Sequence, residues 1–131
     1  MKVEKSTKYV IDASLILGFL LPDEYDIEAF IKVKEFVSGN SKFIAPTLLP
    51  YEIINGLKNA IQRNRVTLNQ ALELTNQFIE FMIPLQEIDL DAVLKLAQDK
   101  DLSVYDASYL YLSKEKNLEL LTLDKQLKDL I

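Results

Sequence analysis

The sequence predicts an α/β domain on a parallel sheet, because short apolar strands alternate with helices along the chain. The runs at 9–11, 43–45 and 120–121 are apolar throughout, which is typical of strands covered on both faces. Between them, apolar residues recur every three or four positions, the spacing of an amphipathic helix. Right-handed connections between parallel strands then place helices on both faces of the sheet.

Turn and capping residues divide the first half of the chain. Asp12 ends the first strand, and Gly39 is expected at the left-handed end of a helix. Pro50 suits the first turn of its helix, where a missing N–H costs nothing. In order, we expect a strand over 8–11, helices over 14–20 and 22–37, a strand over 42–45 and a helix over 47–64.

The second half carries clearer helix starts. Thr67-x-x-Gln70 matches a capping box, Asp89 is a suitable N-cap, and Ser103-x-x-Asp106 resembles a capping box with Asp in place of Glu. Pro84 confines any strand around it to a sheet edge. We expect helices over 67–81, 89–100 and 103–114, strands over 82–85 and 118–122, and a short final helix from residue 124.

Composition limits the kinds of chemistry available. With 131 residues and 49% hydrophobic content, residues 1–131 are expected to form one domain. The chain has no His and no Cys, which excludes thiol nucleophiles, most zinc sites and the commonest general base. The net charge of -5 disfavours a protein that simply coats phosphates. It is compatible with a nuclease whose acidic site a metal neutralises.

The N-terminal segment predicts no export and no membrane anchor. Lysines precede an apolar stretch from Ala13 to Leu21, but Asp12 interrupts the pattern and no small-residue cleavage site follows before Pro22. The stretch is also too short to span a bilayer. We therefore expect a cytoplasmic protein.

Four acidic residues stand in apolar surroundings: Asp12, Glu52, Asp106 and Asp124. Two of them directly follow predicted strands, one lies in the first turn of a helix, and one lies on the helix after a strand. All four are therefore expected near the carboxyl ends of the strands, where α/β sheets bind their ligands. Each also has an ordinary alternative role, as a helix cap or as an exposed surface residue.

The joint pattern favours a metal site. Carboxylate oxygens are the ligands preferred by Mg²⁺ and Mn²⁺, which activate water and polarise phosphodiesters. Without a cation such a cluster repels itself, by about 4 kcal/mol for two charges 4 Å apart at an effective dielectric near 20. A fold that keeps the four acids together therefore needs a cation, or a proton on one of them.

At these positions the sequence resembles the PIN-domain ribonucleases, and in particular their VapC-type toxin branch. Four blocks carry the resemblance, in the family's order and over essentially the whole chain: Tyr9-Val-Ile-Asp12-Ala-Ser14, Pro50-Tyr-Glu52-Ile-Ile-Asn55-Gly-Leu57, Val104-Tyr-Asp106-Ala-Ser-Tyr109 and Leu121-Thr122-Leu-Asp124-Lys-Gln-Leu127. The resemblance implies a three-layer α/β/α fold with a central parallel sheet of four or five strands. The last strand common in the family would lie beyond Ile131, so four strands with an exposed edge are expected.

The resemblance also implies a function. It makes the chain an Mg²⁺- or Mn²⁺-dependent endoribonuclease and the toxin of a toxin–antitoxin pair, with an RNA substrate, a cognate antitoxin and a homodimeric state. Carried over to this sequence, Asp12, Glu52, Asp106 and Asp124 bind the metal and activate water. Ser14 and Thr122 support the site through their hydroxyl groups, and Asn55 is a weaker candidate for a supporting role.

Other interpretations remain open at this stage. The chain is also compatible with a PIN-domain nuclease of RNA processing or quality control, or with a catalytically silent PIN domain that binds a partner. Phosphatases with an aspartyl nucleophile need a second acid two residues after the first, where this chain has Ser14. A receiver domain needs a phosphorylatable Asp after a central strand, and the middle of this chain offers none.

Contacts to RNA outside the acidic centre are harder to predict. Five basic residues flank the acidic positions and are candidates for steering phosphates, although a solvated helix face is the favoured explanation for each of them: Lys58, Arg63, Arg65, Lys125 and Lys128. No stripe of aromatic residues indicates stacking on single strands. Tyr105 and Tyr109 lie on an apolar helix and are expected in the core or in an interface.

Overall fold

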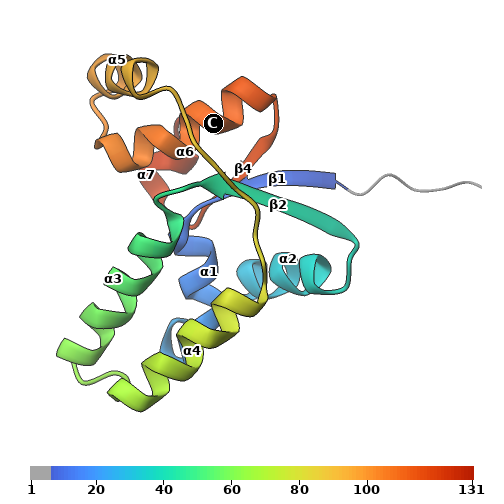
Figure 1. Ribbon diagram of the computed structural model, residues 1–131, viewed down its shortest axis with the longest axis vertical. Coiled ribbons are helices and arrows are strands. Elements are labelled where there is room, and N and C mark those ends of the chain that lie inside the picture. The colour runs from blue at the N-terminus through green and yellow to red at the C-terminus, as the bar shows by residue number, and fades with distance from the viewer. Residues whose placement is uncertain (1–6) are drawn as a thin grey trace, which may run out of the picture.

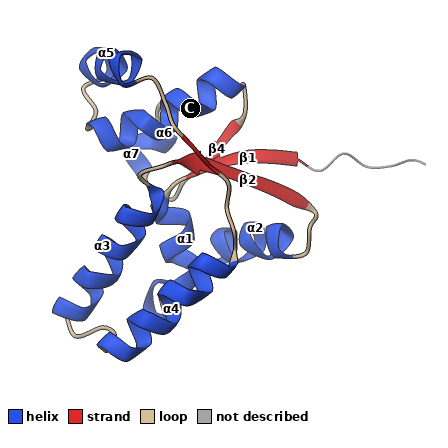
Figure 2. Ribbon diagram, in the orientation of Figure 1, coloured by secondary structure: helices blue, strands red, loops and turns tan. Residues whose placement is uncertain are grey.

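The sheet is parallel and has four strands among residues 7–131, the part of the chain that the computed structural model describes. Residues 1–6 of the predicted 1–131 domain lie outside this range. The strands are β1 (Thr7–Ile11), β2 (Ser41–Pro46), β3 (Leu85–Gln86) and β4 (Glu119–Leu121), in the order β3-β2-β1-β4. β1 pairs with both β2 and β4 and so lies at the centre (Figure 2).

Helices cover both faces of this sheet, which gives the predicted three layers. The helical segments are α1 (Ala13–Leu20), the 3-10 turn η1 (Pro22–Glu24), α2 (Ile27–Val37), α3 (Leu49–Gln62), α4 (Leu68–Glu80), α5 (Leu90–Lys100), α6 (Val104–Lys116) and α7 (Lys125–Lys128). Figure 1 shows α1 to α4 on one side of the sheet and α5 and α6 on the other. The connections β1–β2 and β2–β3 thus use one face, and the connection β3–β4 uses the opposite face.

The core explains why β1 is apolar without interruption. Val10 and Ile11 are fully buried, and helices from both faces pack side chains against the sheet, among them Ile53 of α3 and Leu112 of α6. Each such side chain contributes about 1.5–3 kcal/mol on leaving water. A smaller cluster of Val93, Ala97 and Ala107 joins α5 to α6.

Local signals set most helix ends as predicted. The Thr67 and Gln70 side chains form the reciprocal hydrogen bonds of a capping box at α4, and Asp89 caps α5. Gly39 follows α2 with φ of +79°, in the left-handed region that glycine tolerates. Asn117 ends α6 in the same region.

Two predicted elements differ from the structure. The helix expected over 22–37 is divided into η1 and α2, because the Asp26 side chain accepts a hydrogen bond from the Ala29 N–H and starts a new helix. The strand expected over 82–85 is shifted to Leu85–Gln86, since Met82 has φ of +51° and ends the preceding turn. As predicted, this strand lies at a sheet edge. No helix within residues 7–131 has the length and apolar character needed to cross a membrane.

The close approach of α1 and α3 fixes how two of the predicted site residues lie. α1 follows Asp12 directly, and α3 carries Glu52 in its first turn. Gly56, one turn further along α3, lies against the Leu17 side chain of α1, in space that a Cβ atom would share with the Leu17 methyl groups. The absence of a side chain at Gly56 therefore allows the two helices to pack tightly.

We expect Gly56→Leu to lower the free energy of unfolding by about 1–3 kcal/mol, because the added side chain overpacks the contact between α1 and α3. Urea unfolding measures the change. Asn59→Leu, on an exposed position of the same helix, is the matched control and should stay within about 0.5 kcal/mol of wild type. Equal losses in the two variants would contradict a tight contact at Gly56.

Candidate active site

The four predicted acids lie around the carboxyl ends of the central strands. Asp12 follows β1, Glu52 lies in the first turn of α3 after β2, Asp106 lies in the first turn of α6, and Asp124 caps α7 after β4. These segments meet at one edge of the sheet in Figure 1. We refer to these four residues as the carboxylate quartet.

Asp12 is the most restrained member of the quartet, with a relative exposure of only 5%. Its Oδ1 accepts hydrogen bonds from the Ser14 hydroxyl at 2.7 Å and from the Leu15 N–H at 3.2 Å. Its Oδ2 accepts one from the Thr122 hydroxyl at 2.5 Å. Both carboxylate oxygens are therefore held in fixed positions, one by α1 and the other by the segment after β4.

Ser14 and Thr122 connect Asp12 to Asp124. The two hydroxyl oxygens lie 3.2 Å apart. The Ser14 hydroxyl accepts the Leu123 N–H at 2.8 Å, and the Thr122 hydroxyl accepts the Asp124 N–H at 3.0 Å. Both side chains thus position the backbone that carries Asp124 relative to Asp12.

Glu52 is positioned by a tyrosine from the opposite side of the sheet. The Tyr109 hydroxyl of α6 donates a hydrogen bond to Glu52 Oε1 at 2.5 Å. Tyr109 is only 1% exposed, so the prediction of a core residue is confirmed. Its role toward Glu52 was not predicted, because 57 residues separate the two and a tyrosine on an apolar helix resembles ordinary core. The sequence signal that could have revealed this role is the position of Tyr109 three residues after Asp106 on the same helix.

The quartet is electrostatically strained by its own charge. Burial raises the pKa of Asp12, and Asp124 raises it further, against the lowering by three hydrogen bonds. Burial also raises the pKa of Glu52, opposed by the Tyr109 hydroxyl and reinforced by Asp106 and Asp12. The pKa of Asp106 is raised by burial and by Asp124, while Ser103 opposes the shift. Each of these three shifts therefore includes repulsion by at least one other member of the quartet.

No basic side chain within residues 7–131 forms an ion pair with the quartet. The ion pairs join Arg65 to Asp23 and Glu24, and Lys128 to Glu28. Carboxylates without a basic partner, among side chains that offer oxygen atoms as metal ligands, suit a hard divalent cation.

The spacing of the acids limits how a cation can be held. Within the described range, no three acidic side chains lie close enough to form a ligand group for one ion. Mg²⁺ commonly keeps several waters and binds through only one or two carboxylates, so the donor set fits a hydrated Mg²⁺ or Mn²⁺.

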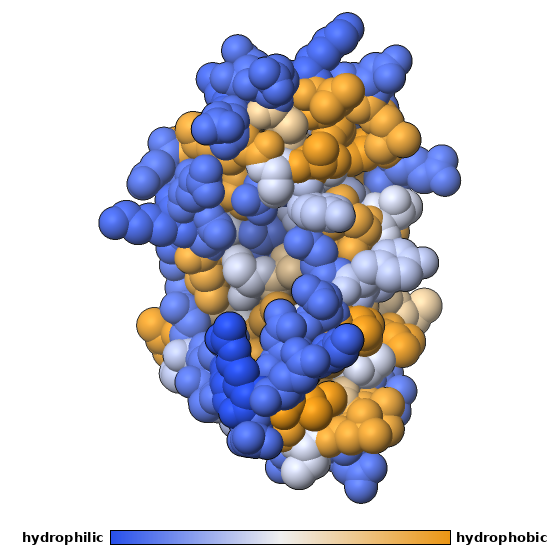
Figure 3. Space-filling model, turned by 90° about the vertical axis from the view of Figure 1, so that its left-hand side faces the viewer, coloured by the Kyte–Doolittle hydropathy of each residue, from blue (hydrophilic) through white to orange (hydrophobic). Residues whose placement is uncertain are grey.

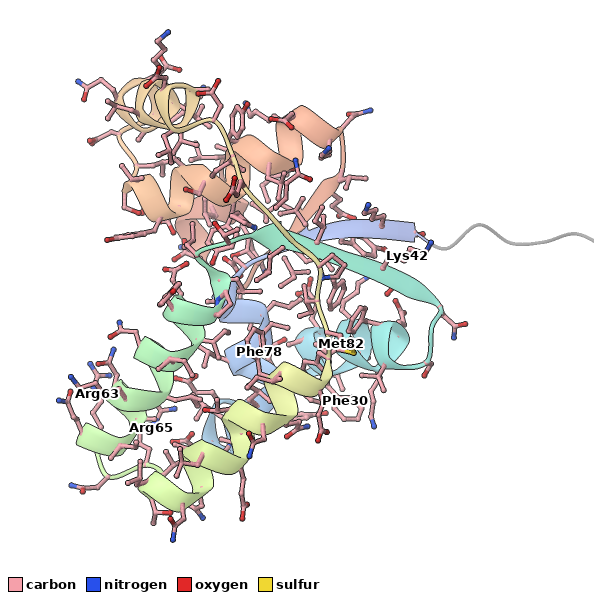
Figure 4. All side chains as sticks on the ribbon, viewed as in Figure 1. Phe30, Lys42, Arg63, Arg65, Phe78 and Met82 are labelled. Carbon is pink, nitrogen blue, oxygen red and sulfur yellow. The ribbon has the colours of Figure 1, made fainter. Side chains whose placement is uncertain are left out.

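Some predicted residues lie apart from this centre. Asn55 is exposed one turn after Glu52 and lines a surface hollow with it, without contacting the other acids. Arg63 and Arg65 lie at the end of α3 that is remote from the sheet, as the labels in Figure 4 show. Arg65 donates two hydrogen bonds to Asp23, so steering of phosphates by Arg65 is not supported. The prediction of core or interface for Tyr105 is wrong as regards the core, since Tyr105 is 61% exposed.

Comparison with known proteins identifies the family. Residues 9–130 match the family described as PIN domain. The chain belongs to the PIN-domain family. The carboxylate quartet spans this match from its first strand to its last helix.

Two relatives from Pyrobaculum aerophilum resemble the chain over nearly its full length. Ribonuclease VapC3 is 31% identical over 93% of this chain and 93% of the relative. Exonuclease VapC9 is 28% identical over 92% of this chain and 83% of the relative.

Solved structures share the fold. The crystal structure of PAE2754 from Pyrobaculum aerophilum has a TM-score of 0.74 at 25% identity, over 92% of this chain and 77% of that chain. The crystal structure of Mycobacterium tuberculosis VapC20, a toxin that cleaves the Sarcin-Ricin loop, has a TM-score of 0.62 at 10% identity. The coverage is 93% of this chain and 94% of that chain, and at this identity the match shows the fold alone.

We expect Tyr109→Phe to raise the pKa of Glu52 and to lower the free energy of unfolding at pH 7 by about 1 kcal/mol. The hydroxyl stabilises the ionised carboxylate, so its loss matters above the pKa of Glu52 and fades as pH falls through it. Urea unfolding at pH 7 and near pH 4 measures this dependence. An equal loss at both pH values would indicate a packing defect instead.

Proposed function

We propose that this PIN-domain chain hydrolyses phosphodiester bonds in RNA as a metal-dependent endonuclease. The observation that carries the proposal is the carboxylate quartet, held at the carboxyl ends of β1 and β4 and the starts of α3 and α6 with no basic partner in the described range. Relatives described as ribonuclease and exonuclease support nucleic acid as the substrate.

We assign the metal ligands to the quartet, either directly or through water: Asp12, Glu52, Asp106 and Asp124. When bound, Mg²⁺ or Mn²⁺ supplies an activated water and polarises the phosphodiester. Repulsion by Asp124 raises the pKa of Asp12, repulsion by Asp106 and Asp12 raises that of Glu52, and repulsion by Asp124 raises that of Asp106, which supports a cation held among the four acids. Ser14 and Thr122 act only by positioning Asp12 and Asp124.

The protein's own groups fix the orientation of the reacting water and phosphate. Asp12 has no freedom to turn, because three hydrogen bonds hold its two oxygens. Glu52 is held at Oε1 by the hydroxyl of Tyr109. Such fixed positions are what a hydrolytic site requires, since small displacements of a catalytic group cost large factors in rate.

The biological role that we propose is that of the toxin of a toxin–antitoxin pair, acting as a homodimer with a cognate antitoxin. The support is the resemblance to proteins described as VapC3 and VapC9 over more than nine-tenths of the chain. A short neighbouring gene for a DNA-binding partner that co-purifies with the chain and blocks its nuclease activity would test this role. A gene that stands alone would favour RNA processing or quality control instead.

We expect Asp12→Asn and Asp106→Asn each to reduce cleavage of an RNA in Mn²⁺ by about 10²–10⁴-fold, because each removes a charge that holds the metal and orients water. A fluorescently labelled oligoribonucleotide resolved on gels measures the rate. Asp91→Asn, at an exposed acid of α5, is the matched control and should retain full activity. Undiminished cleavage in both quartet variants would refute the site, and no cleavage by wild type would favour a silent binding domain.

A circular RNA separates endonuclease from exonuclease activity, which matters because one relative is described as an exonuclease. An endonuclease converts the circle to linear products, whereas an exonuclease finds no end and leaves it intact. Cleavage of the linear form alone would overturn the endonuclease assignment and retain the metal site.

We also expect Asp12→Asn to raise the free energy of unfolding of the metal-free protein at pH 7, because burial raises the pKa of Asp12 and the ionised form is disfavoured in the folded state. Because the pKa of Asp12 is raised in the folded state, wild type loses stability as pH rises through that pKa. In acid Asp12 is protonated, so the stability advantage of Asp12→Asn over wild type should vanish there. Asn keeps the cap on α1.

Added Mn²⁺ should make wild type more stable than Asp12→Asn. At a hundredfold excess over Kd it stabilises wild type by about 2.7 kcal/mol and should leave Asp12→Asn nearly unchanged. Thermal unfolding with and without Mn²⁺ measures both effects, and Asp91→Asn should respond as wild type does. If Asp12→Asn is less stable than wild type without metal, or if Mn²⁺ stabilises it as much as wild type, the assigned role of Asp12 as a metal ligand is contradicted.

A further inference from the structure

Beside the carboxylate quartet lies a hollow of about 300 Å³ lined by Leu48, Tyr51, Glu52, Asn55 and Tyr105. Glu52 belongs both to this hollow and to the quartet, so the two are continuous. Tyr51 directly precedes Glu52 on α3, and Tyr105 directly precedes Asp106 on α6. Two helices from opposite faces of the sheet thus each supply an aromatic ring next to an acid. Figure 3 looks onto this side of the molecule and shows apolar and hydrophilic residues intermixed.

Both rings are open to solvent. Tyr51 is 79% exposed and Tyr105 is 61% exposed. Within residues 7–131 neither stacks on another aromatic ring, whereas Phe36 and Phe43 stack with centroids 4.4 Å apart. The faces of Tyr51 and Tyr105 are therefore available to a ligand.

The chemistry of the lining favours a base over a phosphate. No Lys or Arg lines the hollow, and the Glu52 carboxylate in its wall repels anions. Aromatic faces bind the flat faces of unpaired bases, and the Asn55 amide can both donate to and accept from a base edge. At about 300 Å³ the hollow is at the lower limit of ligand sites, which suits one base.

We propose that this hollow binds a single unpaired base of the RNA substrate against Tyr51 and Tyr105, with the adjoining phosphate at the carboxylate quartet. The proposal rests on the proposed ribonuclease function and adds a requirement to it. Since the faces of paired bases are covered by their neighbours, the hollow accepts a base only from a single-stranded or splayed segment.

The test uses a short unstructured oligoribonucleotide with 2-aminopurine at one position, moved along the strand in a series, and titrated with protein in EDTA. Stacking quenches 2-aminopurine, so wild type should quench it at one position of the series. Tyr51→Ala and Tyr105→Ala should each raise Kd at least about fivefold and lose the quenching. Tyr51→Phe and Tyr105→Phe keep the ring and should bind nearly as wild type does.

Tyr25→Ala is the matched control, because Tyr25 is also 61% exposed but packs near Phe30, away from the hollow. It should leave both Kd and quenching unchanged. A fully paired duplex of the same sequence should fail to compete. Circular dichroism confirms that each variant is folded, which is expected for substitutions at exposed positions.

Four binding results would overturn the proposal. They are alanine variants that bind and quench as wild type does, phenylalanine variants as weak as alanine, an equal loss in Tyr25→Ala, and a duplex that competes as well as the single strand. A change in molecular mass on light scattering for Tyr51→Ala or Tyr105→Ala would also overturn it, by making the hollow an interface between copies.

Cleavage in Mn²⁺ is measured separately, which keeps the two proposals distinguishable. Wild-type cleavage that both alanine variants retain in full, with unchanged binding in EDTA, refutes the base site alone. Position-specific quenching without any cleavage supports the base site and refutes the proposed nuclease.

Discussion

The structure of the site depends on one constraint, the burial of the Asp12 carboxylate without a basic partner in the described range. Burying an ionised carboxylate costs several kcal/mol unless hydrogen bonds or a cation offset it. Here the Ser14 and Thr122 hydroxyls and the Leu15 N–H supply three hydrogen bonds. Because Thr122 lies 110 positions further along the chain, this single side chain ties the end of β1 to the end of β4.

The order of the strands explains why the remaining acids gather there. β1 lies between β2 and β4, so the chain leaves its carboxyl end toward one face and returns over the other. α3 therefore brings Glu52 from one side, and α6 brings Asp106 and Tyr109 from the opposite side. The hydrogen bond from Tyr109 to Glu52 joins the two helix layers across the edge of the sheet. Packing and site geometry are thus set by the same residues.

Local chemistry made much of this structure predictable from the sequence. Thr67, Asp89 and Asp124 act through backbone groups a few residues away, and their helices begin where expected. The acids were predictable because charges in apolar runs are rare. The bond between Tyr109 and Glu52 was not predictable, and neither was the placing of Tyr51 and Tyr105 at one hollow, because each joins segments more than 50 residues apart. The engagement of Arg65 by Asp23 was missed because it also joins distant segments, which lie 42 residues apart.

A chain of net charge -5 that binds a polyanion must combine an acidic centre with a means of attracting phosphate. The carboxylate quartet alone repels phosphate, and two of the five candidate cations, Arg65 and Lys128, form ion pairs with other acids. Under the proposed function, attraction comes also from the metal held by the quartet and from uncharged contacts beside it. Exposed rings at Tyr51 and Tyr105 provide such contacts, since stacking depends little on charge. The aromatic hollow and the acidic centre are therefore complementary parts of one binding surface.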